Sequence, residues 1–137
     1  MRVRAAPTDL DPILLADTGK LLWFFFKLRG RAGRAAYILG FLFLMVVISF
    51  PLYRFMLYPE GTPAAQTWSL IFGICFVAAL WSHVAMSVKR FHDLGRTGFM
   101  SATLFIPVIS LIAFAYLCIA PGTPGPNPYG RSPNAPE

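Results

Sequence analysis

The side chains best able to do chemistry in this sequence lie in one stretch, VKRFHDLGRTGF (Val88–Phe99). At its centre stand His92 and Asp93, a pairing that could perform general acid–base catalysis. Residues adjacent in sequence seldom form a working dyad, however, and the chain contains no nucleophile elbow, HExxH motif or phosphate loop. Two candidate ligands are also too few for a metal site. We therefore predict no catalytic residue, no metal and no cofactor.

The cations of the same stretch favour anion binding. Thr97 is well placed to cap the N-terminus of a helix that would begin near Phe99. A helix N-terminus presents free N–H groups and a partial positive charge, so nearby cations would complete a site for a lipid phosphate. The candidate anion-binding residues are Lys89, Arg90, Arg96, Thr97 and Gly98. The alternative is a tight turn whose cations only set the membrane topology.

A second basic stretch, GRAGRAAY, contains Arg31 and Arg34. Asp93 is surrounded by cations, and a partly desolvated carboxylate needs a partner. A guanidinium can bind a carboxylate through two parallel hydrogen bonds. We predict that Asp93 pairs with Arg31 or Arg34 and so ties the two stretches together. The competing pairing is local, with Arg90 or Arg96.

Long apolar segments must position these residues. The chain of 137 residues is 56% hydrophobic and only 13% charged, whereas soluble domains are roughly a quarter charged. Three segments, Ala36–Leu57, Trp68–Val88 and Phe99–Ala120, are each long enough to cross ~30 Å of hydrocarbon as a helix. Backbone groups in lipid must be paired internally, which favours helices. The sequence therefore predicts an all-α integral membrane protein with about three transmembrane helices.

The flanking segments differ from these spans. Residues 1–19 are mixed in character and are predicted to be mobile. Residues 20–35 are predicted to form an interfacial amphipathic helix that precedes the first span, with a short loop as the alternative. The cations of its polar face would be Lys20, Lys27, Arg31 and Arg34. Residues 20–120 then make up the membrane domain, and residues 121–137 form an irregular tail rich in Pro and Gly.

The distribution of charge predicts the orientation. Seven Lys and Arg residues precede the first span and three lie in the connection 89–98, whereas residues 58–67 contain none and the tail contains one. The positive-inside rule therefore places the N-terminus and the second connection in the cytoplasm, and the first connection and the tail outside. Cys75 and Cys118 lie inside apolar runs, so we expect neither a disulfide nor a zinc site.

Three stretches carry a family resemblance: GRAGRAAY, KRFHDLGRTGF and PGTPGPNPYG. In this order around the predicted spans they closely resemble the domain-of-unknown-function 805 family (YhaH-like bacterial inner-membrane proteins), over residues 24–133 or so. The matching tail residues are Gly122, Gly125, Asn127, Tyr129 and Gly130. The chain departs from the family pattern at Ala36, where the family has an acidic residue. The resemblance implies an inner-membrane location and a fold, but no activity.

Several functions are compatible with these features. The sequence favours a non-catalytic membrane module whose basic stretches bind anionic lipid, a membrane partner protein or a second copy of the chain. One alternative is a subunit of a small oligomeric transporter or channel, because His83, Ser87 and Arg90 follow helical spacing. A membrane enzyme is a further alternative. No nucleic-acid partner is expected, since the basic residues form no groove-reading motif.

Overall fold

The computed structural model describes residues 12–136, with side chains described from residue 16 onward. This part of the chain is helical and contains no strand, so the predicted all-α class is confirmed. The elements in chain order are α1 (Pro12–Phe26), α2 (Arg34–Met56), α3 (Pro63–Asp93), the 3-10 helix η1 (Gly98–Phe105) and α4 (Ile109–Ile119).

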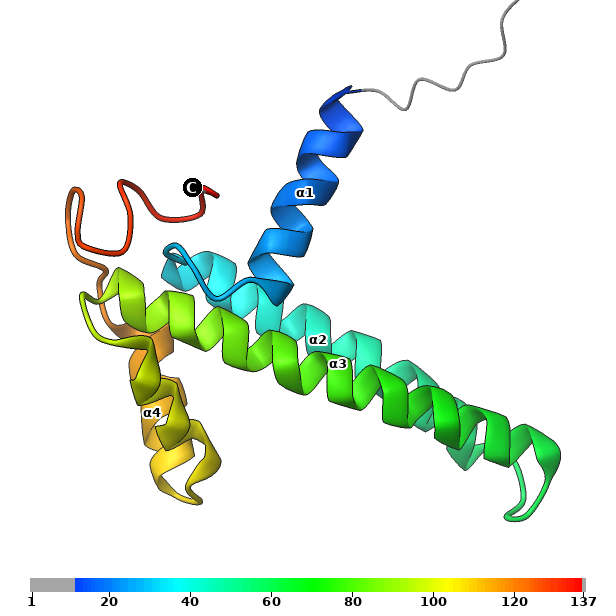
Figure 1. The fold of residues 1–137 in the computed structure, drawn as a ribbon. Helices are drawn as coiled ribbons and strands as arrows, with labels where there is room; N and C mark the ends of the chain where they lie inside the picture. Colours follow the sequence, from blue (N-terminus) through cyan, green and yellow to red (C-terminus); the bar gives the residue numbers. More distant parts are fainter. Residues whose placement is uncertain (1–11, 137) are drawn as a thin grey trace, which may run out of the picture.

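The helices α2 and α3 form a long antiparallel pair, which is the centre of the fold (Figure 1). At 1.5 Å per residue, their 23 and 31 residues give lengths of about 35 and 46 Å. Both helices are therefore long and apolar enough to cross a membrane. Thr62 caps α3 by accepting a hydrogen bond from the Ala65 amide at 3.3 Å.

The third predicted span, residues 99–120, is not one continuous helix, because this segment folds back on itself. The helix α4 has 11 residues and is about 16 Å long, roughly half of the hydrocarbon thickness. Between η1 and α4, Pro107 has no amide to donate and Val108 has a left-handed φ of 68°. Hydropathy and length cannot distinguish a straight apolar helix from an apolar hairpin, and this turn decides between them.

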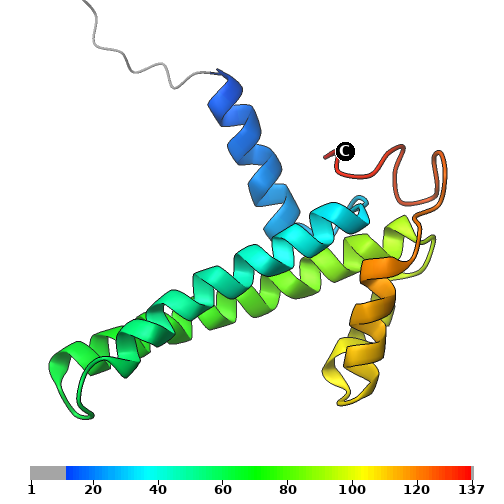
Figure 2. The same cartoon turned by 180° about the vertical axis from the view of Figure 1, so that it is seen from behind.

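Both ends of this hairpin lie at the same end of the α2/α3 pair (Figure 2). The amide and the hydroxyl of Thr123 each donate to the Asp93 carbonyl at 2.8 Å. Further along the tail, the Asn134 amide donates to the Arg31 carbonyl at 2.9 Å. The tail therefore lies against the end of α3, whereas the sequence prediction placed it on the opposite side from the second connection; the difference arises because the chain reverses direction at Val108.

The helix α1 projects steeply away from the α2/α3 pair, with its C-terminal end against the pair (Figures 1 and 2). It begins at Pro12, so residues 12–19 of the segment predicted to be mobile are helical, while residues 1–11 lie outside the described part. The predicted amphipathic helix over residues 20–35 is also wrong, because α1 ends at Phe26. Its four cations are consequently divided among α1, the connecting loop and the first turn of α2.

Candidate functional site

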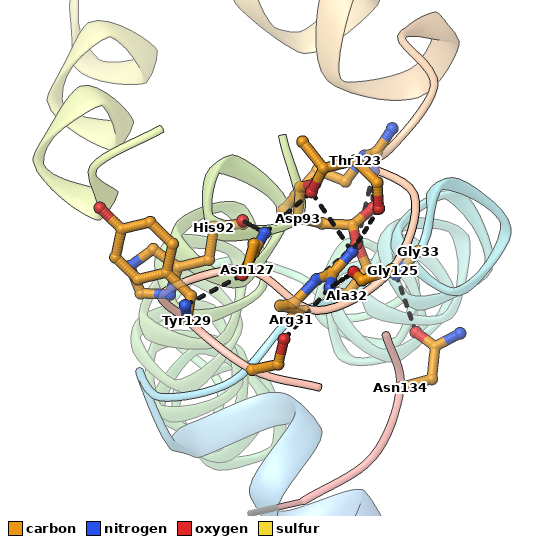
Figure 3. Close-up of polar contacts among 12 residues, drawn as sticks. Arg31, Ala32, Gly33, His92, Asp93, Thr123, Gly125, Asn127, Tyr129 and Asn134 are labelled. Atoms are coloured by element: carbon orange, nitrogen blue, oxygen red, sulfur yellow. Dashed lines mark hydrogen bonds and ion pairs between the residues drawn. The ribbon is translucent and has the colours of Figure 1, made fainter. Parts of the chain in front are cut away.

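The stretches that carry the family resemblance meet around one carboxylate (Figure 3). Asp93, the last residue of α3, accepts hydrogen bonds from Arg31 Nε at 3.0 Å and from Arg90 Nη1 at 2.5 Å. Arg31 Nη2 also lies 2.9 Å from Asp93 Oδ1. The three side chains are almost fully buried, at 4% exposure or less. The predicted pair with Arg31 and the competing local pair with Arg90 are thus both present.

Arg90 also binds the C-terminal end of α4, where the hairpin of η1 and α4 ends. Its Nε donates to the Leu117 carbonyl at 2.7 Å, and its Nη2 donates to the Ala120 carbonyl. These carbonyls belong to the last turn of α4, where the backbone acceptors have no helical partner and carry partial negative charge. The guanidinium therefore supplies a C-terminal cap for α4 while it pairs with Asp93.

Lys89 performs the same task for α1. Its Nζ donates to the carbonyls of Trp23, Phe24 and Lys27 at 2.6–2.7 Å, which uses all three ammonium donors. The ammonium also lies 4.8 Å from the Trp23 ring centroid, a cation–π contact. Lys89 and Arg90 were predicted to bind an anion, but both are completely buried and their donors are occupied by the protein itself. Neither side chain is available to a ligand, because its donors already bond backbone carbonyls at the C-terminal end of a helix.

The other predicted anion-binding residues lie near the surface. Arg96 and Thr97 are exposed and Gly98 is half-buried. Thr97 occupies the N-cap position as predicted, but its side chain makes no capping hydrogen bond and the helix that follows is 3-10. Arg34, at the start of α2, is exposed, and no ion pair joins it to Asp93 in the described part of the chain.

Arg31 organises the tail. Its Nη1 donates to the Gly125 carbonyl at 2.6 Å and to the Gly130 carbonyl at 3.2 Å, and its Nη2 donates to the Thr123 carbonyl at 2.7 Å. At Gly122 a Cβ would overlap the Asp93 carboxylate, so only glycine fits there. The Pro-rich tail forms no regular secondary structure in this segment, and a single buried guanidinium supplies hydrogen bonds to three of its backbone carbonyls.

Asn127 and Tyr129 complete the tail's attachment. Asn127 Nδ2 donates to the carbonyl of His92 and to the hydroxyl of Thr123, both at 2.8 Å. The Tyr129 amide in turn donates to Asn127 Oδ1 at 2.9 Å. Sequence reasoning missed Thr123, as well as Asn134, whose Oδ1 accepts from the Gly33 amide at 2.8 Å. Thr123 lies inside the tail stretch of the family pattern, which was a usable signal for it.

His92 stands beside Asp93 in sequence but has different partners. Its Nδ1 lies 3.1 Å from the Gly30 carbonyl, and its ring stacks on the Tyr129 ring at 4.1 Å with an interplanar angle of 3°. Both carboxylate oxygens of Asp93 are occupied by arginines, and no hydrogen bond joins His92 to Asp93 within residues 12–136. The geometry therefore provides no His–Asp dyad.

The predicted polar face on α3 is also divided. Ser87 Oγ donates to the His83 carbonyl at 2.7 Å and lies 3.0 Å from the Tyr37 hydroxyl, while Arg90 belongs to the Asp93 cluster. His83 Nδ1 is buried with no hydrogen-bond partner in the described part and borders an apolar cavity of about 130 Å³. His83, Ser87 and Arg90 therefore do not line a common polar pathway along α3.

Metal ligands do not gather in the described residues, where no group of three His, Cys, Asp or Glu side chains could hold an ion. Cys75 and Cys118 are free thiols in half-buried positions.

Comparison with curated proteins and with solved structures gives no match. A family model described as "Protein of unknown function (DUF805)" matches residues 25–131. This range includes all three stretches that meet around Asp93. The chain therefore belongs to the DUF805 family.

Proposed function

We propose that this chain is a non-catalytic module of the bacterial inner membrane whose cytoplasmic end binds anionic lipid headgroups. The observation that carries the proposal is an unbalanced surface at the Asp93 end of the α2/α3 pair. The cationic end, as we call it, comprises the exposed cations Lys27, Arg29, Arg34 and Arg96, and Arg131 of the tail is also exposed at this end. Asp93 is buried and already paired, so an anionic lipid surface is the natural source of countercharge.

The exposed surface of the long helices supports a membrane location. Only 22% of the most apolar window of α2 and 33% of that of α3 are buried inside the protein. Large side chains such as Leu39, Val46 and Leu70 are 66–69% exposed. A soluble protein would bury such helices, whereas a bilayer solvates them directly.

The folded hairpin supports a topology of two spans and a re-entrant segment. Residues 98–119 leave and return at the cationic end, and each arm is about 16 Å long, half the depth of the hydrocarbon. The large apolar side chains of the turn, Phe105, Ile106 and Val108, are 48–70% exposed. With the tail on the same side, the positive-inside rule favours both termini in the cytoplasm.

Single cysteines test this topology in a background where Cys75 and Cys118 are replaced with Ala. A cysteine at Glu60 should react with an impermeant thiol reagent in intact cells, because it follows α2 at the end opposite the cationic end. Cysteines at the exposed positions Thr97 and Ser132 should react only after lysis. If the cysteines at Ser132 and Glu60 both reacted in intact cells and the one at Thr97 did not, the chain would cross the membrane three times.

Lipid retention tests the proposed activity. The triple variant Lys27→Gln, Arg34→Gln, Arg96→Gln removes three exposed cations and leaves the buried cluster intact. At about 1 kcal/mol per cation near an anionic surface, the loss is about 3 kcal/mol, or roughly 100-fold in affinity. Native mass spectrometry after gentle extraction should show far less bound phosphatidylglycerol and cardiolipin.

The matched control for that experiment is Lys20→Gln. Lys20 is also exposed, but its Nζ lies 3.7 Å from Asp17 Oδ1. Because Asp17 already balances this charge, removal of Lys20 should change the attraction to anionic lipid much less than removal of an unpaired cation. Arg90 is unsuitable as a test residue, because its loss would leave Asp93 with one partner fewer. An unchanged lipid complement in the triple variant would contradict the proposed function.

A further inference from the structure

The far end of the α2/α3 pair, where the two helices are connected, carries a cation without an acidic partner (Figure 1). Arg54 lies in the last turn of α2, and Glu60 is the only acid in the connection that follows. No ion pair joins Arg54 to Glu60 within residues 12–136. A cation this close to an apolar span requires another source of negative charge.

Two aromatic side chains hold the Arg54 guanidinium. Its central carbon lies 4.9 Å from the Trp68 ring centroid and 5.6 Å from the Tyr58 ring centroid, distances typical of cation–π contacts. Arg54 Nη2 also donates to the Tyr58 hydroxyl at 2.8 Å. Trp68 is itself packed edge-on against Phe50, with ring centroids 5.8 Å apart. The cation is therefore held in place before any ligand arrives, which lowers the entropic cost of binding.

The Arg54 cluster, which consists of Arg54, Tyr58 and Trp68, has hydrogen-bond donors to spare. Arg54 Nε is buried with no hydrogen-bond partner in the described part of the chain. Arg54 Nη1 also makes no hydrogen bond there, and it is not buried. The Tyr58 oxygen accepts from Nη2, so its own hydrogen remains free to be donated. Nη1 and the Tyr58 hydroxyl both lie next to Nη2, close enough together to donate to two oxygens of one anionic group.

The depth of Arg54 in the membrane indicates which anionic group it would meet. Arg34 and Arg54 lie twenty residues apart in α2, which is about 30 Å at 1.5 Å per residue. This distance matches the thickness of the hydrocarbon core, so Arg34 at the headgroups of one leaflet puts Arg54 at the headgroups of the other. The neighbouring side chains Phe50, Tyr53 and Met56 are 60–75% exposed, as contact with acyl chains requires. The anionic group available at this depth is a lipid phosphate.

We propose that the Arg54 cluster binds the phosphate of a phospholipid in the leaflet opposite the cationic end, with Arg54 Nη1 and the Tyr58 hydroxyl donating to the phosphate oxygens. The inference uses the proposed crossing of the membrane by α2, but not the lipid binding proposed for the cationic end, because the two sites face different leaflets. A phosphate needs no net charge on the lipid that carries it. The Arg54 cluster therefore accepts zwitterionic phospholipids, which a basic surface attracts only weakly.

The test is a titration of the purified full chain in detergent, followed by native mass spectrometry. The probe is phosphatidylcholine, which has a phosphate but no net charge and no hydrogen-bond donor in its headgroup. It is compared with the diacylglycerol of identical acyl chains and with soluble glycerophosphocholine. We expect phosphatidylcholine to bind about tenfold more tightly than the diacylglycerol, as one charge-assisted hydrogen bond predicts. Equal affinities for these two lipids would overturn the inference, as would equal affinity for the soluble headgroup.

Two variants examine the named donors. Arg54→Gln removes the charge and should weaken phosphatidylcholine binding about tenfold without changing that of the diacylglycerol. Tyr58→Phe removes only a hydroxyl and should weaken it about fivefold, which keeps the inference testable if the Arg54 variant fails to fold. Tyr53→Phe is the matched control, because Tyr53 is 60% exposed on α2 outside the cluster and its loss should change nothing. Unaltered binding in either of the first two variants, or an equal loss in Tyr53→Phe, would overturn the inference.

Arg34→Gln is the control that separates this site from the proposed function. Arg34 is exposed at the cationic end, about 30 Å from Arg54 along α2, so the variant should reduce retention of phosphatidylglycerol and leave phosphatidylcholine unaffected. A loss of phosphatidylcholine as large as that in Arg54→Gln would overturn the inference. Selective loss in Arg54→Gln, with anionic lipid unchanged in the triple variant of the cationic end, would support this site and remove the proposed function. The reverse pattern would remove this site and leave the proposed function standing.

Discussion

Replacement of Asp93 with Asn is expected to lower the free energy of unfolding by about 3–5 kcal/mol. The reason is that Arg31 and Arg90 are 1% exposed or less and share this one carboxylate. Without its charge, two guanidiniums would remain in a desolvated site with only carbonyl partners. Chemical or thermal unfolding of the purified protein in detergent measures the loss.

An exposed acid provides the comparison for this variant. Asp17→Asn removes the partner of Lys20, but both side chains are about 60% exposed, so we expect a change under ~1 kcal/mol. A charge swap adds a second check. Because Asp93 bonds two arginines, Asp93→Arg should be rescued only in part by Arg31→Asp. Equal effects of Asp93→Asn and Asp17→Asn would show that the cluster is not buried as described.

The second large effect is expected for Gly122→Ala. The new methyl group would overlap the Asp93 carboxylate, so either the tail or the acid must move. Overpacking of this kind costs about 1–3 kcal/mol, and displacement of Asp93 from its arginines would add to it. Hydrogen exchange should therefore increase at the Thr123 amide, which bonds the Asp93 carbonyl.

Gly19→Ala is the matched control for this substitution. Gly19 lies inside α1 and a Cβ there would meet nothing within 4 Å, so the change should be neutral or stabilise α1 by up to about 1 kcal/mol. If Gly122→Ala were as harmless as Gly19→Ala and left the tail protected, the close approach of the tail to Asp93 would be wrong.

Some features of this protein followed from the sequence alone. The apolar lengths of α2 and α3 required helices of membrane-spanning length, because composition over a window reports the solvent that an element needs. The pairing of Asp93 with Arg31 was predictable for a similar reason. An acid that lies among cations near an apolar surface has to be neutralised, and few partners were available.

Other features depended on tertiary structure. The third apolar segment has the composition of a span, but a left-handed residue at Val108 and the contact between Thr123 and Asp93 make it a hairpin. Likewise, Lys89 and Arg90 appear in the sequence as surface cations. In the fold they cap helices α1 and α4, through carbonyls that lie 27–66 residues away in the chain.

The physical reason is the same in each case. Hydropathy and spacing describe what one segment requires, whereas a buried cation is placed by whichever unpaired carbonyls the fold brings within hydrogen-bond distance. Helix ends supply such carbonyls, and their positions depend on where each helix stops and how it packs. The sequence therefore determined which residues needed partners, and only the tertiary structure decided which partners they found.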